Sequence, residues 1–134
     1  MKRCIVIADD DPIIVDLVKV RLGMARFRVV CTRDAATAME MVCSEQPVAV
    51  ILDVQVPGSG PAALAKIKAN PETAQLPVLM LTGKRNPERA MKGGANDTMV
   101  KAFNPDALLE RVARLVKLST TTWDKSLPAP VWDV

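Results

Sequence analysis

Short apolar runs of strand length recur along the chain, and segments with helical spacing separate them. The runs are rich in β-branched residues and are bounded by turn-forming residues, which is typical of strands. We expect strands over residues 3–8, 27–32, 48–52, 77–82 and 97–100.

In the segments between these runs, apolar residues recur three and four positions apart, which places them on one face of a helix. The four stripes are Ile14, Leu17, Val18 and Leu22; Ala35, Ala38, Met39 and Val42; Ala63, Leu64 and Ile67; and Leu108, Val112, Leu115 and Val116. Asp11-Pro12, Gly60-Pro61 and Asn104-Pro105 predict helix starts, because each puts a capping-type residue before a proline suited to the first turn. A further short helix is expected around Asn86-Pro87-Glu88, ending near Gly93-Gly94.

The regular alternation of strands and helices predicts an α/β domain with a doubly wound, five-stranded parallel sheet. Helices are expected on both faces of such a sheet, and its crossovers are right-handed. Ligands of these sheets bind beyond the carboxyl ends of the strands, where the strand order reverses. The side chains at those ends are therefore the first candidates for a site.

Polar side chains follow four of the predicted strands. The first strand leads into Asp9, Asp10 and Asp11, and the third leads into Asp53. Thr82 and Lys101 lie at the ends of the fourth and fifth strands. Because the carboxyl ends of parallel strands share one edge, we expect a single acidic site there.

Clustered carboxylates repel one another unless a positive charge lies among them. Magnesium is the natural cation, since it prefers oxygen ligands and needs only one or two carboxylates with waters and phosphate oxygens. Lys101 supplies a second positive charge, and Thr82 supplies a hydroxyl donor. Together with the carboxylate of Asp53 as nucleophile, this set suits phosphoryl transfer onto an aspartate.

Composition excludes several other kinds of chemistry. The chain has no histidine, which removes histidine acid–base catalysis and the commonest transition-metal ligand. Its three cysteines lack CxxC spacing and fit buried thiols in a reducing compartment. A net charge of +3 is too small to argue for direct nucleic-acid binding. No apolar run reaches the roughly 18 residues of a membrane span, and no signal peptide is recognisable, so a cytoplasmic location is expected.

The 134 residues suffice for one domain, which we place at residues 1–118, with residues 119–134 as a tail or the start of a linker. The tail holds Trp123 and Trp132. These two residues either pack back onto the domain or belong to a docking segment, and the sequence does not choose between these readings.

The order and position of the motifs resemble those of receiver domains of two-component response regulators. The resemblance covers residues 3 to about 118. It rests on Asp9-Asp10-Asp11-Pro12, on Asp53 with Pro57 and Gly58, on Thr82-Gly83, and on Gly94-Ala95-Asn96-Asp97 leading to Lys101-Ala102-Phe103. It implies a flavodoxin-like (βα)5 fold with strand order 2-1-3-4-5.

The resemblance also implies roles for individual residues. Asp53 would accept a phosphoryl group from the phosphohistidine of a histidine kinase or phosphotransfer protein. Mg²⁺ would be bound by Asp10, by Asp53 and by the backbone carbonyl of Gln55, with Asp9 acting through a water. Lys101 would pair with Asp53 and then with the phosphate, and Thr82 would turn toward the phosphoryl oxygens. The chain would then be a signalling switch and not an enzyme, catalysing only its own phosphorylation and dephosphorylation.

Four features depart from the family pattern. Thr98 replaces an aromatic residue that normally moves with the threonine, and Ala102 replaces a proline that often follows a cis bond. A non-proline cis bond costs about 2.5–4 kcal/mol, so we expect a trans bond or a strained loop. Val56 replaces a common methionine, and Gly60-Pro61 alters the start of the third helix. None of these changes removes a chemical group from the predicted site.

Other functions compete with the switch. A degenerate receiver would bind partners without phosphorylation, and Thr98 and Ala102 keep that reading open. An aspartyl-phosphate hydrolase commonly has a second aspartate two positions after the nucleophile, where this chain has Gln55. A flavin carrier would need a phosphate-binding loop where this chain has aspartates. The aspartates after the first strand could also merely cap a helix.

The sequence says less about which protein responds to the switch. A downstream protein could bind at the fourth and fifth helices, and a homodimer is left open. The basic residues there are Arg85, Arg89, Lys92, Arg111, Arg114 and Lys117. Such a set is most often a solvated face.

Overall fold

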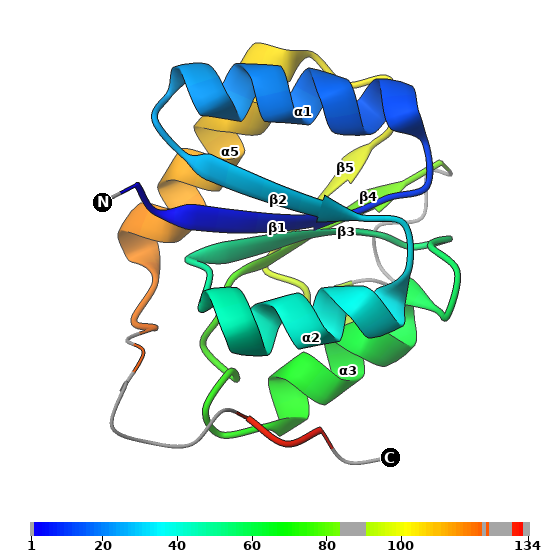
Figure 1. Ribbon diagram of the computed structural model, residues 1–134, viewed down its shortest axis with the longest axis vertical. Helices are drawn as coiled ribbons and strands as arrows, with labels where there is room; N and C mark the ends of the chain where they lie inside the picture. The colour runs from blue at the N-terminus through cyan, green and yellow to red at the C-terminus, as the bar shows by residue number, and fades with distance from the viewer. Residues whose placement is uncertain (1, 84–90, 122, 124–129, 133–134) are drawn as a thin grey trace.

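A five-stranded parallel sheet forms the centre of the molecule (Figure 1). The computed structural model describes residues 2–83, 91–121, 123 and 130–132. The strands are β1 (Cys4–Ala8), β2 (Arg28–Thr32), β3 (Ala49–Asp53), β4 (Val78–Thr82) and β5 (Asp97–Val100). They lie in the order β2-β1-β3-β4-β5, and each neighbouring pair is parallel. The predicted fold class and strand order are confirmed.

Helices cover both faces of the sheet. They are α1 (Pro12–Met24), α2 (Ala35–Glu45), α3 (Gly60–Ala69) and α5 (Pro105–Leu118). In Figure 1, α1 and α5 lie on one face, and α2 and α3 lie on the other. The helix predicted around Asn86-Pro87-Glu88 lies outside the described residues, although Met91 and Lys92 are helical and a turn follows them. No helix among the described residues is both long and apolar enough to cross a membrane.

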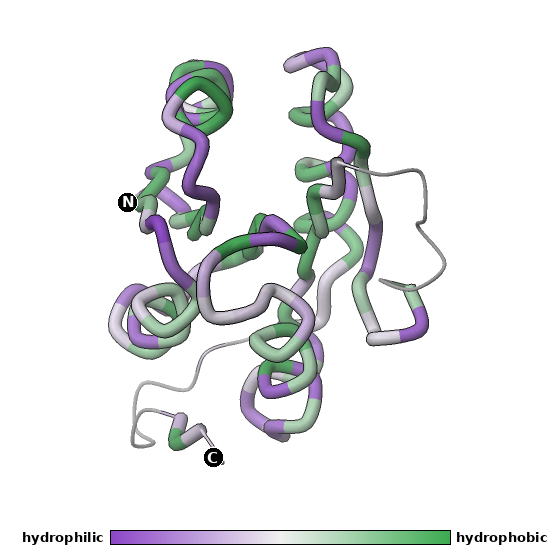
Figure 2. Tube along the Cα trace, turned by 90° about the vertical axis from the view of Figure 1, so that its right-hand side faces the viewer, coloured by the Kyte–Doolittle hydropathy of each residue, from purple (hydrophilic) through white to green (hydrophobic). Residues whose placement is uncertain are grey.

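Successive side chains of each strand enter opposite layers of the core. Ile5 and Ile7 of β1 pack with α1 and α5, whereas Val6 and Ala8 pack with α2 and α3. We call the layer that contains Val6, α2 and α3 the first core, and the layer that contains Ile5, α1 and α5 the second core. The alternation follows from the two-residue period of a strand, and burial on both faces explains why the runs are continuously apolar. Each helix shows hydrophilic residues as well as hydrophobic ones around its turns (Figure 2).

The helix starts follow the predicted signals with one correction. Asp11 and Asn104 are the N-caps of α1 and α5, and each accepts a hydrogen bond from a backbone N–H two positions later. The cap of α3 is Ser59 rather than Gly60, because the hydroxyl of Ser59 accepts the backbone N–H of Ala62 and glycine has no side chain that could do so.

One member of the predicted apolar stripes is exposed to solvent. Leu17 is 38% exposed, whereas Val18 and Leu22 of the same helix are fully buried. Adjacent positions on a helix differ by about 100°, so α1 can point only part of its apolar surface at the sheet. The predicted stripe was therefore one residue too wide.

Candidate functional site

The carboxyl ends of β1 and β3 bring two aspartates together. These central strands pair in parallel with Ala8 opposite Leu52, so the next residues, Asp9 and Asp53, leave the sheet at the same level. The chain turns to β2 on one side of β1 and to β3 on the other, which makes this the point where strand order reverses. The geometry of a doubly wound sheet thus places both carboxylates in its usual ligand-binding crevice.

Asp10 completes a cluster of three carboxylates. Ligand oxygens of Asp9, Asp10 and Asp53 all lie within 4.8 Å of one another. Asp9 is fully buried and Asp53 is 2% exposed, whereas Asp10 faces solvent. Asp11 stands apart, because its side chain accepts the backbone N–H of Ile13 at 3.0 Å and caps α1. Helix capping therefore accounts for one of the three consecutive aspartates and leaves the other two free for chemistry.

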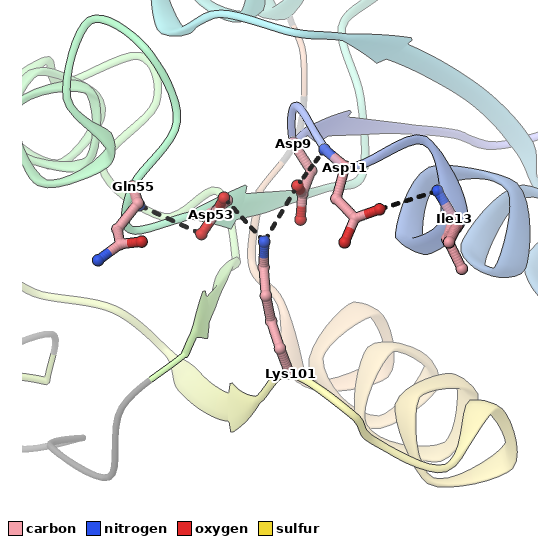
Figure 3. A network of polar contacts seen from close by, with 6 residues as sticks. All are labelled: Asp9, Asp11, Ile13, Asp53, Gln55 and Lys101. Carbon is pink, nitrogen blue, oxygen red and sulfur yellow. Dashed lines mark hydrogen bonds and ion pairs between the residues drawn. The ribbon is translucent and has the colours of Figure 1, made fainter.

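Lys101 reaches between the two buried carboxylates (Figure 3). Its Nζ donates to Asp53 Oδ2 at 3.0 Å and to Asp9 Oδ1 at 3.2 Å. The pairing of Lys101 with Asp53 was expected from the resemblance, but the second partner, Asp9, was not. One ammonium therefore holds two carboxylates that lie far from it in sequence.

The local charges shift two pKa values. Burial raises the pKa of the Asp9 carboxyl, and the neighbouring charge of Asp53 raises it further, against the lowering effects of the Asp11 N–H and Lys101. Burial lowers the pKa of Lys101, but its hydrogen bonds to Asp53 and Asp9 outweigh that effect and leave this pKa raised. The ammonium of Lys101 therefore stays charged. The positive charge near Asp9, by contrast, does not fully offset the burial of its carboxylate.

Unused acceptor capacity remains in the cluster. Asp9 Oδ1 accepts from the backbone N–H of Asp11 at 2.9 Å and from Lys101, but Asp9 Oδ2 is buried and has no hydrogen-bond partner among the described residues. Asp53 Oδ1 accepts the backbone N–H of Gln55 at 3.2 Å. A buried carboxylate oxygen without a partner is costly, so its presence beside two further carboxylates fits a hard cation.

Thr82 lies beside Lys101 at the carboxyl end of the sheet. It is the last residue of β4 and is 8% exposed, and its carbonyl accepts the backbone N–H of Lys101 at 2.8 Å. The site residues predicted at the four strand ends are therefore carried by one edge of the sheet.

The loop after Lys101 takes a strained path. The described residues contain no cis peptide bond, and Ala102 has a φ of 68°. This left-handed conformation is disfavoured for a residue with a Cβ. Of the two expected outcomes, the structure has both: the bond is trans and the loop is strained.

Gly60 supports the site through its backbone, which the sequence did not reveal. A Cβ at Gly60 would lie 2.3 Å from the carbonyl oxygen of Asp53. Only glycine lets α3 begin this close to the end of β3. The departure of Gly60-Pro61 from the family pattern is thus a packing requirement of this chain. Val56 is 2% exposed and belongs to the first core, so its departure also concerns packing.

Thr98 is bound to the basic face of α5. Its carbonyl accepts from Arg111 at 3.2 Å, and the same guanidinium pairs with Asp97 at 2.9 Å. Arg114 lies 3.8 Å from Asp97. Part of the basic set on the last helix is therefore engaged within the chain, while Arg85 and Arg89 lie outside the described residues.

A cleft of about 510 Å³ opens beside the carboxylate cluster, between the start of α1 and the end of β2. Asp9 and Asp10 line it together with Cys31 and Arg33. The cluster can therefore be reached from solvent at the side of Asp10.

The sequence and the fold match known proteins. The family model described as "Response regulator receiver domain" matches residues 5–113. The chain is 33% identical over 117 residues to the "DNA-binding dual master transcriptional regulator RpaA" of a Synechocystis species, covering 84% of this chain and 48% of that protein. The chain thus spans about half the length of this relative.

Two solved structures have the same fold. The receiver domain of NtrX from Brucella abortus is 30% identical with a TM-score of 0.79, and the match covers 86% of this chain and 99% of that one. The signal receiver domain of a signal transduction histidine kinase from Syntrophus aciditrophicus is 26% identical with a TM-score of 0.83, covering 93% and 98%. With the family model covering most of its length, this chain belongs to the receiver domains of two-component response regulators, which are signalling switches.

Proposed function

We propose that the chain accepts a phosphoryl group on Asp53 and thereby changes the surface it offers to a partner protein. The observation that carries this proposal is the bridge of Lys101 between Asp53 and Asp9, with an unpartnered buried oxygen on Asp9. A carboxylate nucleophile, a fixed cation and spare oxygen ligands are what phosphoryl transfer onto an aspartate requires.

The receiver family implies a magnesium ion, and the residues at the cluster fit one. Asp9, Asp10 and Asp53 supply hard oxygen donors close enough to share a cation. Asp10 and Asp53 would bind it directly, with the backbone carbonyl of Gln55, and Asp9 would act through a water. When bound, the ion supplies charge neutralisation for the phosphoryl oxygens.

The reaction itself needs few groups from the chain. An oxygen of Asp53 attacks the phosphorus of a phosphohistidine, the new O–P bond forms as the N–P bond breaks, and the imidazole leaves with the bonding electron pair and is protonated from solvent. Lys101 keeps its charge and turns from the carboxylate to the phosphoryl oxygens. Thr82 would donate its hydroxyl to those oxygens, which moves its loop.

The partners follow from this chemistry. The donor would be a histidine kinase or a phosphotransfer protein, because the phosphoryl group comes from a phosphohistidine in the reaction above. A downstream protein would read the change, with α5 as one candidate surface. RpaA is named as a DNA-binding regulator, and its greater length leaves room for parts that this chain does not match.

Two alternatives remain distinguishable. A degenerate receiver would keep the fold without the chemistry, but the complete set of carboxylates and Lys101 favours phosphorylation. A hydrolase would need an acid–base group two positions after Asp53, where Gln55 offers an amide that cannot transfer a proton at neutral pH.

Intact-mass measurement after incubation with Mg²⁺ and acetyl phosphate tests the proposal. The wild-type chain is expected to gain one phosphoryl group, and Asp53→Asn is expected to gain none. Asp11→Asn serves as the matched control, since Asp11 caps α1 and lies outside the carboxylate cluster. An equal adduct on Asp53→Asn, or none on the wild type, would overturn the proposal. Rapid turnover of many phosphoesters would favour the hydrolase.

A further inference from the structure

Beyond α5, the chain returns to the opposite face of the sheet. Pro130, Val131 and Trp132 lie near α2 and α3 in Figure 1, although α5 covers the other face. Trp123 packs against the first core as well. We call Trp123 together with residues 130–132 the docked tail.

We infer that the docked tail is this chain's own occupant of the α2–α3 face, so that a partner protein can use that face only by displacing it. This inference is independent of phosphorylation at Asp53. The sequence left open whether the two tryptophans pack on the domain or belong to a docking segment. In the structure, both pack against the domain.

Hydrogen bonds hold the docked tail at several points. The indole N–H of Trp123 donates to the carbonyl of Pro47 at 2.8 Å, and that of Trp132 donates to the carbonyl of Met39 at 3.2 Å. The side chain of Asn70 donates to the carbonyl of Val131 at 3.2 Å. These contacts come from α2, from the C-cap of α3 and from the loop between α2 and β3.

Apolar contact supplies the second part of the argument. Both indole rings are partly buried and pack against the first core. Tryptophan buries a large apolar surface while its N–H finds an acceptor, which makes it an effective anchor. Between the anchors, Val131 is 81% exposed, so the tail presents its tryptophans inward and its valine outward.

The position of these contacts separates them from the acidic site. Pro47 and Asn70 lie at the edge of the sheet where β3 begins and α3 ends, whereas Asp53 and Gly60 lie at the opposite ends of the same elements. The contacts of the docked tail with Pro47, Met39 and Asn70 therefore involve none of the carboxylates of the acidic site. Displacing the docked tail would change the surface that the α2–α3 face offers to a partner, without changing the phosphorylation site.

Tryptophan fluorescence tests the inference directly. The chain has two tryptophans and no tyrosine, so its intrinsic emission reports on the tail alone. In the full-length wild type we expect an emission maximum shifted to shorter wavelength than in concentrated urea, and weaker quenching by acrylamide. Trp123→Phe and Trp132→Phe assign the signal to each ring. Emission and quenching that match the urea-unfolded chain for both rings would overturn the inference.

Cys43 provides an independent readout, since its Sγ lies 3.3 Å from the carbonyl of Pro130. In a Cys31→Ser background, Trp132→Ala is expected to raise the rate of Cys43 modification by Ellman's reagent by about tenfold, because the thiol loses its cover. Val131→Ala is the matched control and should leave the rate unchanged. Circular dichroism checks that each variant is folded. An unchanged rate in folded Trp132→Ala would contradict docking at this point.

Discussion

Asp9 dominates the electrostatics of the site. It is fully buried beside Asp53, and one of its oxygens has no hydrogen-bond partner among the described residues. Lys101 offsets only part of this cost, since its single charge serves two carboxylates. A buried carboxylate of this kind is a functional group held at the expense of stability.

Asp9→Asn is therefore expected to stabilise the metal-free chain by on the order of 1 kcal/mol at pH 7. A pKa raised in the fold means that the folded state binds the proton more readily than the unfolded state does. Stability due to Asp9 is then greatest at low pH and falls as the pH rises from the unfolded value of 3.8 through the folded pKa.

Urea unfolding across a pH series in the presence of a chelator measures this effect. The wild type should lose stability over that window relative to Asp9→Asn. If the variant is instead less stable at neutral pH, the ion pair with Lys101 outweighs the burial of the charge.

Ala102 carries a cost of a different kind, because its φ of 68° suits glycine. Ala102→Gly should stabilise the fold by up to about 1 kcal/mol, since the relief of left-handed strain exceeds the entropy that glycine adds to the unfolded chain. Thermal unfolding measures the change. Ala65→Gly at an exposed position of α3 is the control, and it should destabilise by about 1 kcal/mol. Equal losses in both variants would show that Ala102 is unstrained.

At the scale of elements, the start of α3 is fixed by the end of β3. Ser59 caps the helix and Gly60 allows its first turn to lie against the carbonyl of Asp53. The distance between this helix and the strand thus depends on the absence of one Cβ. Any movement of α3 would therefore change the position of Asp53.

Gly60→Ala is expected to destabilise the chain by about 1–3 kcal/mol, because the new methyl group collides with backbone that has little room to move. Gly23→Ala is the matched control: no heavy atom lies within 4 Å of the added Cβ, and alanine favours the helical state by about 1 kcal/mol. Chemical denaturation of both variants distinguishes them. Opposite signs are expected, and a neutral Gly60→Ala would show that α3 can shift.

At the scale of the whole molecule, the sheet gathers three carboxylates at one edge, close enough to share a cation. The strands β1 and β3 pair side by side between the two cores, and this pairing holds Asp9 and Asp53 close together. Rigid proximity of like charges is relieved by any cation that binds the folded state and not the unfolded one.

Magnesium should therefore raise the melting temperature. At a concentration ten times its dissociation constant, the ion adds about 1.4 kcal/mol to the free energy of unfolding. Asp10→Asn should weaken this shift, whereas Asp16→Asn, an exposed position on α1 outside the cluster, should preserve it. Differential scanning calorimetry with and without MgCl₂ makes the comparison. A shift that survives in Asp10→Asn would place the ion elsewhere.

The sequence predicted the elements well because their signals are local. Strands such as residues 48–52 are marked by continuous apolar runs, and helix starts such as Asp11-Pro12 are marked by residues whose own side chains make the cap. It erred where an element's orientation mattered: Leu17 belongs to an apolar stripe, but α1 can bury only part of that stripe.

By itself, then, the sequence determined the alternation of elements, the parallel sheet and the placement of Asp9, Asp53, Thr82 and Lys101 at strand ends. Only the tertiary structure decided that Lys101 bridges two carboxylates, that α3 lies against the Asp53 carbonyl and that both tryptophans pack on the α2–α3 face. Lys101 is 92 residues from Asp9 and 48 from Asp53. Contacts over such separations depend on how elements pack, and no local pattern of residues encodes the distance between two side chains that meet only after folding.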